Sequence, residues 1–223
     1  MIKNNQLIFE NHIELSSKLA QKILLIAKKS ISLKGEFTIV LTGGKSVLNL
    51  YKILVKSDSN WDKWHIYISD ERCLPVDDRD RNDQIINNIW LNHSPIPKYN
   101  IHFIRAELGM VESQVDYTNT MKHVGKFDVT LLSVGEDGHT ASLFPCHDYP
   151  ENNNVVLEYN SPKHPKERIS LSYNRLKNSK YVFKIISGSA KKEVVKMLFQ
   201  HKNVPINNIS GDKQVIFINK NAM

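Results

Sequence analysis

The sequence predicts an α/β domain with a mostly parallel sheet covered by helices on both faces. Short β-branched runs alternate along the chain with segments of helical spacing, which is the pattern of βαβ units. Several of these runs stop at glycine or at charged residues, as strands of open α/β sheets do where they carry functional groups. No stretch resembles a linker between domains, so residues 1–223 are expected to form a single domain.

The elements of the first half follow from the spacing of their apolar residues. Residues 10–30 place apolar side chains at helical intervals and carry lysines near the end. EFTIVL at 36–41 is a short β-branched run that predicts a strand, and a helical pattern resumes at 46–56 after two glycines. The next elements are expected to be a strand, a helix, an extended segment and a helix, in the order 63–69, 82–92, 101–104 and 110–123.

The second half begins with FDVTLL at 127–132, a strand that opens directly into the loop VGEDGHTASLFP at 134–145. Four prolines punctuate residues 145–165, which predicts a long loop, and long loops in compact domains are usually functional. The remaining elements are expected to be two strands, a helix and a last strand, in the order 168–173, 180–187, 189–201 and 214–219.

The composition is that of a soluble globular protein, with 41% hydrophobic and 24% charged residues. No run approaches the roughly 18 consecutive apolar residues of a membrane helix, so no membrane association is expected. The N-terminal segment lacks the pattern of a secretory signal. Cys73 and Cys146 lie far apart and form no metal-like pair, which is typical of a reducing cytoplasm. The protein is therefore expected to be cytoplasmic.

The balance of charge points to an anionic partner. Thirty Lys and Arg against 23 Asp and Glu give a formal net charge of +7. Nucleic acid and a phosphorylated small molecule are the two candidates. The basic residues are spread along the chain, and no helix-turn-helix, zinc-finger or RNP-like signature accompanies them. A small phosphorylated ligand is therefore favoured, and no nucleic-acid partner is expected.

Polar residues follow three of the expected strands. They are Gly43, Gly44, Lys45 and Ser46 after the first, Asp70, Glu71 and Arg72 after the second, and Asp137 and His139 after the strand at 127–132. Glycines after a strand let backbone N–H groups approach an anion, so the glycine pair predicts a phosphate cradle. Its spacing matches neither GxxxxGK[ST] nor GxGxxG. Taken singly, each set also fits a turn or a helix cap, but three sets at neighbouring strand ends favour a functional site.

Five segments together carry a resemblance to a known family. They are, in chain order, LTGGKS, WHIYISDERCLPVDDRDRND, FDVTLLSVGEDGHTASLFP, SPKHPKERISLSY and SGSAKKEVV. From about residue 36 onward the chain resembles the 6-phosphogluconolactonase family, part of a wider group of sugar-phosphate enzymes that includes glucosamine-6-phosphate deaminase. DGHTASLFP is a highly specific motif of this resemblance.

The resemblance implies a Rossmann-like three-layer α/β/α fold. It also implies hydrolysis of 6-phospho-D-glucono-1,5-lactone to 6-phospho-D-gluconate in the oxidative pentose phosphate pathway, with no metal and no organic cofactor. By the same resemblance His139 is the catalytic base and Asp137 lies beside it. The residues implied to hold the substrate are Gly43, Gly44, Lys45, Ser46, Arg72, Arg168 and Lys191, with Asp70, Glu71 and Asn82 in support.

The sequence departs from the family's pattern at some of these positions. Lys45 and Ser46 stand where Ser-Thr or Thr-Pro is usual. Arg81 replaces the serine that commonly precedes Asn82, and Ser133 replaces a glycine. These changes leave open which hydroxyl groups contact the phosphate, whereas the DGH segment is intact.

Lactone hydrolysis needs a water nucleophile, a base and stabilisation of the developing oxyanion. A histidine, with an ordinary pKa of roughly 6.5, suits a base that works near neutrality. Asp137 would fix the tautomer of His139, and loop N–H groups or Arg72 would meet the oxyanion. Because GxSxG is absent, direct attack by water is favoured over an acyl-enzyme on Ser142.

Two rival functions stay open beside hydrolysis. A deaminase or isomerase of the same fold would continue the DGH loop toward Phe-Asn-Glu, but here the sequence continues Thr-Ala-Ser-Leu-Phe-Pro. A non-catalytic sugar-phosphate-binding protein that controls transcription would need a DNA-binding domain, for which no residues are left over. The protein is expected to be a monomer or a weak homodimer.

Overall fold

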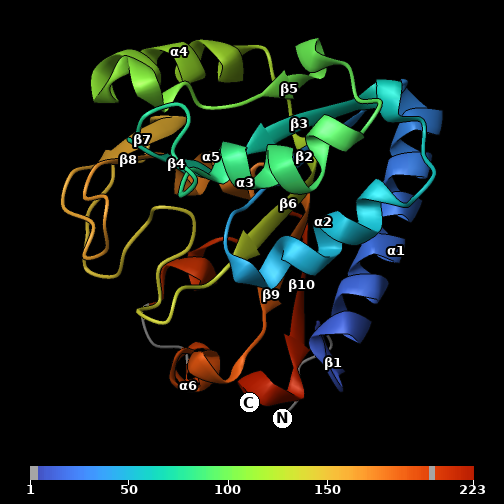
Figure 1. Cartoon of the computed structure of the whole chain (residues 1–223). Helices are drawn as coiled ribbons and strands as arrows, with labels where there is room; N and C mark the ends of the chain where they lie inside the picture. Colours follow the sequence, from blue (N-terminus) through green and yellow to red (C-terminus); the bar gives the residue numbers. More distant parts are fainter. Residues whose placement is uncertain (1–4, 201–203) are drawn as a thin grey trace.

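The computed structural model describes residues 5–200 and 204–223 and contains a seven-stranded sheet in which every pairing is parallel (Figure 1). The strand order is β1-β10-β9-β6-β2-β3-β5. The strands are β1 (Gln6–Phe9), β2 (Phe37–Leu41), β3 (Trp64–Ile68), β5 (Ile101–His102), β6 (Phe127–Ser133), β9 (Ser179–Ile186) and β10 (Lys213–Asn219). The helices are α1 (His12–Lys34), α2 (Leu48–Val55), α3 (Asn82–Ile89), α4 (Met110–Lys122), α5 (Tyr173–Lys177) and α6 (Lys192–Phe199).

The two central strands are buried on both faces. All five residues of β2 are buried, and so are the first six residues of β6. This explains why FTIVL and FDVTLL are nearly continuous apolar runs rather than alternating ones, because a parallel sheet needs cover on each side.

Helices provide that cover on both faces. Trp64 and Tyr67 of β3 are three residues apart, so their side chains leave opposite faces of the sheet. Trp64 packs edge-on against Trp90 at the end of α3, and α2 lies between α1 and α3. On the other face Tyr67 packs on Phe127, and the guanidinium of Arg175 in α5 lies 3.9 Å from the Phe127 ring centroid. The expected three-layer α/β/α arrangement is confirmed.

Helix α1 shows how local signals set an element's ends. The Asn11 side chain accepts hydrogen bonds from the backbone N–H groups of Ile13 and Glu14, so it caps the first turn. Gly35 ends the helix in the left-handed region, with φ of 83°, where a side chain would be strained. The helix is longer than the predicted 10–30 because the stop signal lies at this glycine. None of the helices in the described ranges is long and apolar enough to cross a membrane.

The structure corrects the loop expected at 145–165. Part of it forms β7 (Val155–Glu158), which pairs antiparallel with β8 (Arg168–Leu171), and β8 pairs antiparallel with β4 (Asp70–Arg72). The polar residues after β3 therefore form a short strand of a second sheet. Strands this short have no readable periodicity, and their partners lie far away in the sequence, so local patterns could not reveal them.

Other elements also differ from the expectation. Strand β1 was not predicted, and the extended segment at 101–104 shortens to the two residues of β5. The strand expected at 168–173 ends at Leu171, because the Ser172 side chain accepts from the Arg175 backbone N–H and caps α5. The helix expected at 189–201 begins as a 3-10 turn, η6 (Ser189–Lys191), before α6, and its last predicted residue lies outside the described residues.

The strand order places a switch point between β2 and β6. From β2 the chain adds β3 and β5 toward one edge, then returns and adds β6, β9 and β10 toward the other edge. The connections on either side of this pair therefore diverge at the carboxyl ends of β2 and β6. Open α/β proteins bind their ligands at such switch points, so the loops after these two strands are expected to carry the functional site.

Candidate active site

The loops after β2 and β6 meet at the switch point. Ser133, the last residue of β6, donates its hydroxyl to the Gly43 carbonyl at 3.4 Å. A Cβ placed on Gly44 would lie 3.7 Å from the same hydroxyl oxygen. The expectation that the GGKS, DER and DGH segments follow neighbouring strands is confirmed by the order β6-β2-β3.

The DGH segment folds back over Gly135. The Gly135 N–H donates to the His139 carbonyl at 2.7 Å, and Gly138, with φ of 90°, closes the turn. A Cβ on Gly135 would lie 2.1 Å from His139 Nδ1 and 2.3 Å from Asp137 Oδ1. Only glycine leaves room there for both side chains, so this residue brings the acid and the histidine together.

Asp137 and His139 form a direct pair. His139 Nδ1 is in short hydrogen-bond contact with Asp137 Oδ1. Burial raises the pKa of Asp137, but the hydrogen bond and charge of His139 and the charge of Lys163 outweigh it and hold that pKa well below its usual range. The carboxylate is therefore ionised near neutrality. With Nδ1 engaged by the carboxylate, Nε2 is the ring atom left to exchange a proton with a ligand.

Two ammonium groups flank this pair. Lys163 Nζ lies 3.6 Å from Asp137 Oδ2, and Lys191 Nζ lies 3.9 Å from Glu136 Oε1. Burial lowers the pKa of Lys191, Glu136 raises it, and the charge of Lys163 lowers it further. Lys163 was missed by the sequence reasoning, although the segment SPKHPKER drew attention to the region. Its place beside Asp137 depends on the loop before β8.

Two similar glycine turns flank β6. After β2, Gly44 (φ of 93°) leads into the 3-10 turn η1 (Lys45–Val47) and then α2; after β9, Gly188 (φ of 103°) leads into η6 and α6. Turn η1 also contacts β9. Lys45 is exposed and Ser46 is half-buried. Both turns therefore present a helix start and a lysine toward the same end of the sheet, which suits an anion.

Arg72 and Arg168 are brought together by the second sheet, where they lie opposite each other in the β4–β8 register. Arg168 is buried, and its guanidinium donates to the carbonyls of Lys163, His164 and Pro165 at 3.1 to 3.3 Å. It therefore holds the loop that carries Lys163. Arg72 donates to the Asp80 carbonyl at 2.6 Å, and its Nε is buried without a hydrogen-bond partner among the described residues.

Glu71 caps a helix. Its carboxylate accepts the backbone N–H groups of Arg72, Asn82 and Asp83, each at 2.8 Å, at the start of α3. Burial and the charge of Asp83 raise the pKa of Glu71 to about 8, against the opposing effect of the three N–H groups. The Glu71 side chain is fully buried and its carboxylate is already bonded to three backbone N–H groups, so it stabilises the start of α3. This agrees with the alternative that the residue is a helix cap.

Asp70 and Asn82 connect the strand ends. Asp70 accepts hydroxyl hydrogen bonds from Ser69 at 2.8 Å and from Ser142 at 2.7 Å. Ser142 is fully buried, which removes it as an accessible nucleophile. Asn82 donates to the Asp70 carbonyl at 3.0 Å, and a Cβ on Gly43 would lie only 1.9 Å from its Oδ1. Gly43 is therefore required by the close approach of Asn82.

Metal ligands do not gather in this region. Among residues 5–200 and 204–223, no three or more His, Cys, Asp or Glu side chains are arranged to hold a metal ion. Cys73 and Cys146 are free thiols.

The fold and the site define an α/β protein of the doubly wound class, with an acid–histidine pair and cationic side chains at its switch point. The chain belongs to the family of glucosamine-6-phosphate isomerases and 6-phosphogluconolactonases, whose model matches residues 10–217.

Proteins similar to this chain carry the lactonase name. This chain is 33% identical over 215 residues to "Probable 6-phosphogluconolactonase 4, chloroplastic" of Oryza sativa subsp. indica. The match covers 88% of this chain but 66% of the rice protein. It is 28% identical to the 6-phosphogluconolactonase of Thermotoga maritima, covering 90% and 92% of the two chains. The crystal structure of that Thermotoga maritima enzyme superposes with a TM-score of 0.90, at 27% identity over 98% of this chain and 100% of the other.

Proposed function

We propose that the chain is a 6-phosphogluconolactonase that hydrolyses 6-phospho-D-glucono-1,5-lactone to 6-phospho-D-gluconate in the oxidative pentose phosphate pathway. The observation that carries the proposal is the Asp137–His139 pair, held over Gly135 at the switch point. The names of the similar proteins from rice and Thermotoga maritima support the choice of substrate.

In the proposed reaction His139 acts as the general base. Its Nε2 takes a proton from water while the water oxygen attacks the lactone carbonyl carbon, giving a tetrahedral oxyanion. Asp137 fixes the ring through Nδ1 and stabilises the imidazolium that forms. When the oxyanion collapses, the bond between the carbonyl carbon and the ring oxygen breaks, and the ring oxygen receives the proton from Nε2. The histidine and the carboxylate are then as they began.

The cationic groups are proposed to bind the phosphate, stabilise the oxyanion and position the loop of Lys163. Lys191 and the two glycine turns supply ammonium and N–H groups for the phosphate. Lys163 joins this set because its ammonium lies 3.6 Å from Asp137 Oδ2 and its charge acts on Lys191. Arg72 is proposed to meet the oxyanion, since its side chain is only half-buried and the β4–β8 register sets it opposite Arg168. Arg168 is proposed to act mainly by holding the loop of Lys163.

Other parts of the expectation stay predictions. Residues 1–223 are predicted to form one domain, and the protein is predicted to be a monomer or a weak homodimer. It is also predicted to be cytoplasmic and to need no metal or organic cofactor. The name of the rice protein includes a chloroplast location, so the compartment needs its own measurement.

The test is hydrolysis of freshly made 6-phosphogluconolactone, with 6-phosphogluconate followed by a coupled dehydrogenase and the spontaneous rate subtracted. The purified protein should accelerate this reaction with and without chelator, and should act poorly on gluconolactone that lacks the phosphate. Release of ammonia from glucosamine 6-phosphate without lactonase activity would favour the deaminase instead. Tight binding of 6-phosphogluconate with no turnover of either substrate would favour a non-catalytic sensor.

A further inference from the structure

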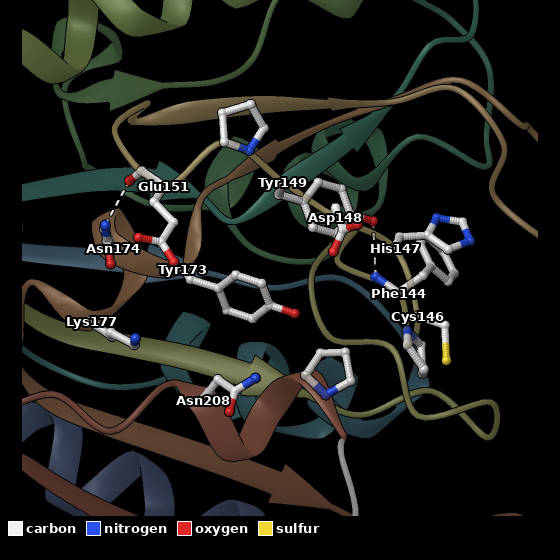
Figure 2. A pocket seen from close by; sticks show the side chains of 13 residues that line it. Phe144, Cys146, His147, Asp148, Tyr149, Glu151, Tyr173, Asn174, Lys177 and Asn208 are labelled. Atoms are coloured by element: carbon white, nitrogen blue, oxygen red, sulfur yellow. Dashed lines mark hydrogen bonds between the residues drawn. The ribbon is translucent and has the colours of Figure 1, made fainter.

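A cavity of about 370 Å³ adjoins the DGH loop on the side of α5 (Figure 2). Residues 144–151, which begin at the end of the loop 134–145, form one wall, and Tyr173 and Lys177 of α5 are among the residues opposite. The ring of Tyr149 lies in that wall, 6.3 Å from the ring centroid of Tyr173. The wall between cavity and site therefore depends on how residues 144–151 are held.

The wall is anchored by a buried carboxylate. Glu158, 4% exposed, accepts the Tyr149 hydroxyl at 2.5 Å, faces His147 Nδ1 at 2.7 Å and accepts the Asn160 N–H at 2.6 Å. Burial raises the pKa of Glu158, but the Tyr149 and His147 hydrogen bonds lead the effects that lower it below its usual range. The buried carboxylate holds Tyr149, His147 and Asn160 in place, because losing any one of these hydrogen bonds would leave part of its charge unpaired and away from water.

The same tyrosine reaches the loop. While its hydroxyl donates to Glu158, the oxygen accepts the Phe144 backbone N–H at 3.0 Å, the dashed contact in Figure 2. The Phe144 ring lies 4.8 Å from the His139 ring centroid and 5.7 Å from the Arg168 guanidinium carbon. Phe144 is 2% exposed, so it is the packed surface against which the imidazole rests.

We propose that Tyr149 and Glu158 are positioning residues for His139 and act through Phe144. The inference rests on the proposed function. One hydroxyl fixes the main chain of Phe144, and the Phe144 ring limits where the imidazole can lie, so Nε2 stays aimed at the reacting water. Neither residue touches the reacting atoms. The contribution is to the geometry of proton transfer, where small displacements have large effects on rate.

The test compares Tyr149→Phe with Tyr173→Phe. Both variants remove one hydroxyl from the same cavity and keep the ring, but the Tyr173 hydroxyl interacts with Asn208 rather than with Phe144. Steady-state kinetics with 6-phosphogluconolactone and NMR spectra of the ligand-free protein are recorded for each. The His139 ring signals are assigned by their loss in His139→Asn, and the Phe144 amide signal, among those of the eight labelled phenylalanines, by its loss in Phe144→Leu.

Tyr149→Phe should lower kcat roughly tenfold or more while KM changes little, because phosphate binding is left intact. It should also move the Phe144 amide and His139 ring signals, and Glu158→Gln should move them in the same direction by less. Tyr173→Phe should do neither. Unchanged His139 signals and unchanged kcat in Tyr149→Phe, or equal changes in Tyr173→Phe, would overturn the proposal. If the wild type has no lactonase activity, the proposed function fails, and the spectra alone decide whether these residues position His139.

Discussion

The two ends of the central sheet each hold an aspartate beside basic side chains, and the two clusters differ in how completely they are satisfied. At the amino end, Asp128 of β6 is fully buried. Its Oδ2 accepts the Thr38 N–H at 2.9 Å and lies 2.9 Å from Lys34 Nζ, and its Oδ1 accepts Lys180 Nζ at 2.9 Å. Both carboxylate oxygens are therefore occupied.

At the carboxyl end, Asp137 is bonded on one side only. Oδ1 contacts His139, while Oδ2 has no hydrogen-bond partner in the described residues and lies 3.6 Å from Lys163 Nζ. The Asp137 side chain keeps 27% of its surface exposed. Incomplete pairing of this kind, at a switch point, leaves groups free to respond to a ligand, whereas complete pairing stabilises the fold. The comparison predicts that changes at the carboxyl end mainly lower activity, whereas changes at the amino end mainly lower stability.

The largest effect is expected from His139→Asn. Removing the proposed base should lower kcat about 10²–10⁴-fold with KM nearly unchanged, because the lost interaction is made chiefly in the transition state. Asparagine preserves polarity and approximate size, so the variant should stay folded, with only the small loss of stability in urea that follows from the lost Asp137 contact. A folded variant with near-wild-type kcat would take the histidine out of the mechanism.

Asp128→Ala should have the opposite profile. Lys34 and Lys180 are partly exposed and can turn to water, but the buried Thr38 N–H would lose its acceptor, which costs about 1–3 kcal/mol in the free energy of unfolding. Urea denaturation followed by circular dichroism measures this loss, and kcat per folded molecule should stay the same. If kcat fell while stability held, the amino-end cluster would have to be linked to catalysis.

A smaller effect is expected from replacing one lysine at each end of the sheet. Lys191→Ala should raise KM for the phosphorylated lactone roughly tenfold to a hundredfold, the worth of one charge-assisted hydrogen bond. Activity on unphosphorylated gluconolactone should scarcely change. Lys180→Ala is the matched control, because its ammonium is bonded to Asp128 at the other end of the sheet. An equal rise of KM in both variants would point to general charge effects rather than to a phosphate site.

The smallest effect concerns acid stability. For Asp128, burial raises the pKa, but bonds from Thr38, Lys180 and Lys34 lower it overall. For Asp137, burial also raises the pKa, but the contact with His139 leads the effects that lower it overall. A lowered pKa gives stability that is fully present above the unfolded value of about 3.9 and is lost as the pH falls through the folded value. Asp128→Asn and Asp137→Asn should therefore be less stable than wild type at pH 7, with the gap narrowing below about pH 4. Denaturation curves at a series of pH values measure this difference in stability. A difference that did not change with pH would show that folding does not favour the ionised form of either carboxyl group.

Much of the fold was readable because its signals are local. The runs at β2 and β6 are apolar because both faces are covered, and the glycines after β2 and β9 stop the strands where the chain takes positive φ. The DGH loop was likewise readable, since Gly135 and Gly138 permit the turn that joins Asp137 to His139.

By itself, then, the sequence determined the parallel α/β architecture, because apolar runs and glycine positions act on neighbouring residues, and it pointed to Asp137 and His139 through the family motif DGHTASLFP. Only the tertiary structure decided how the outlying polar residues are used. The β4–β8 pairing sets Arg72 opposite Arg168, the loop before β8 brings Lys163 to Asp137, and Glu71 is occupied at the start of α3. Hydrogen-bond partners distant in the chain are set by strand register and loop path, and neither leaves a periodic trace in the residues themselves.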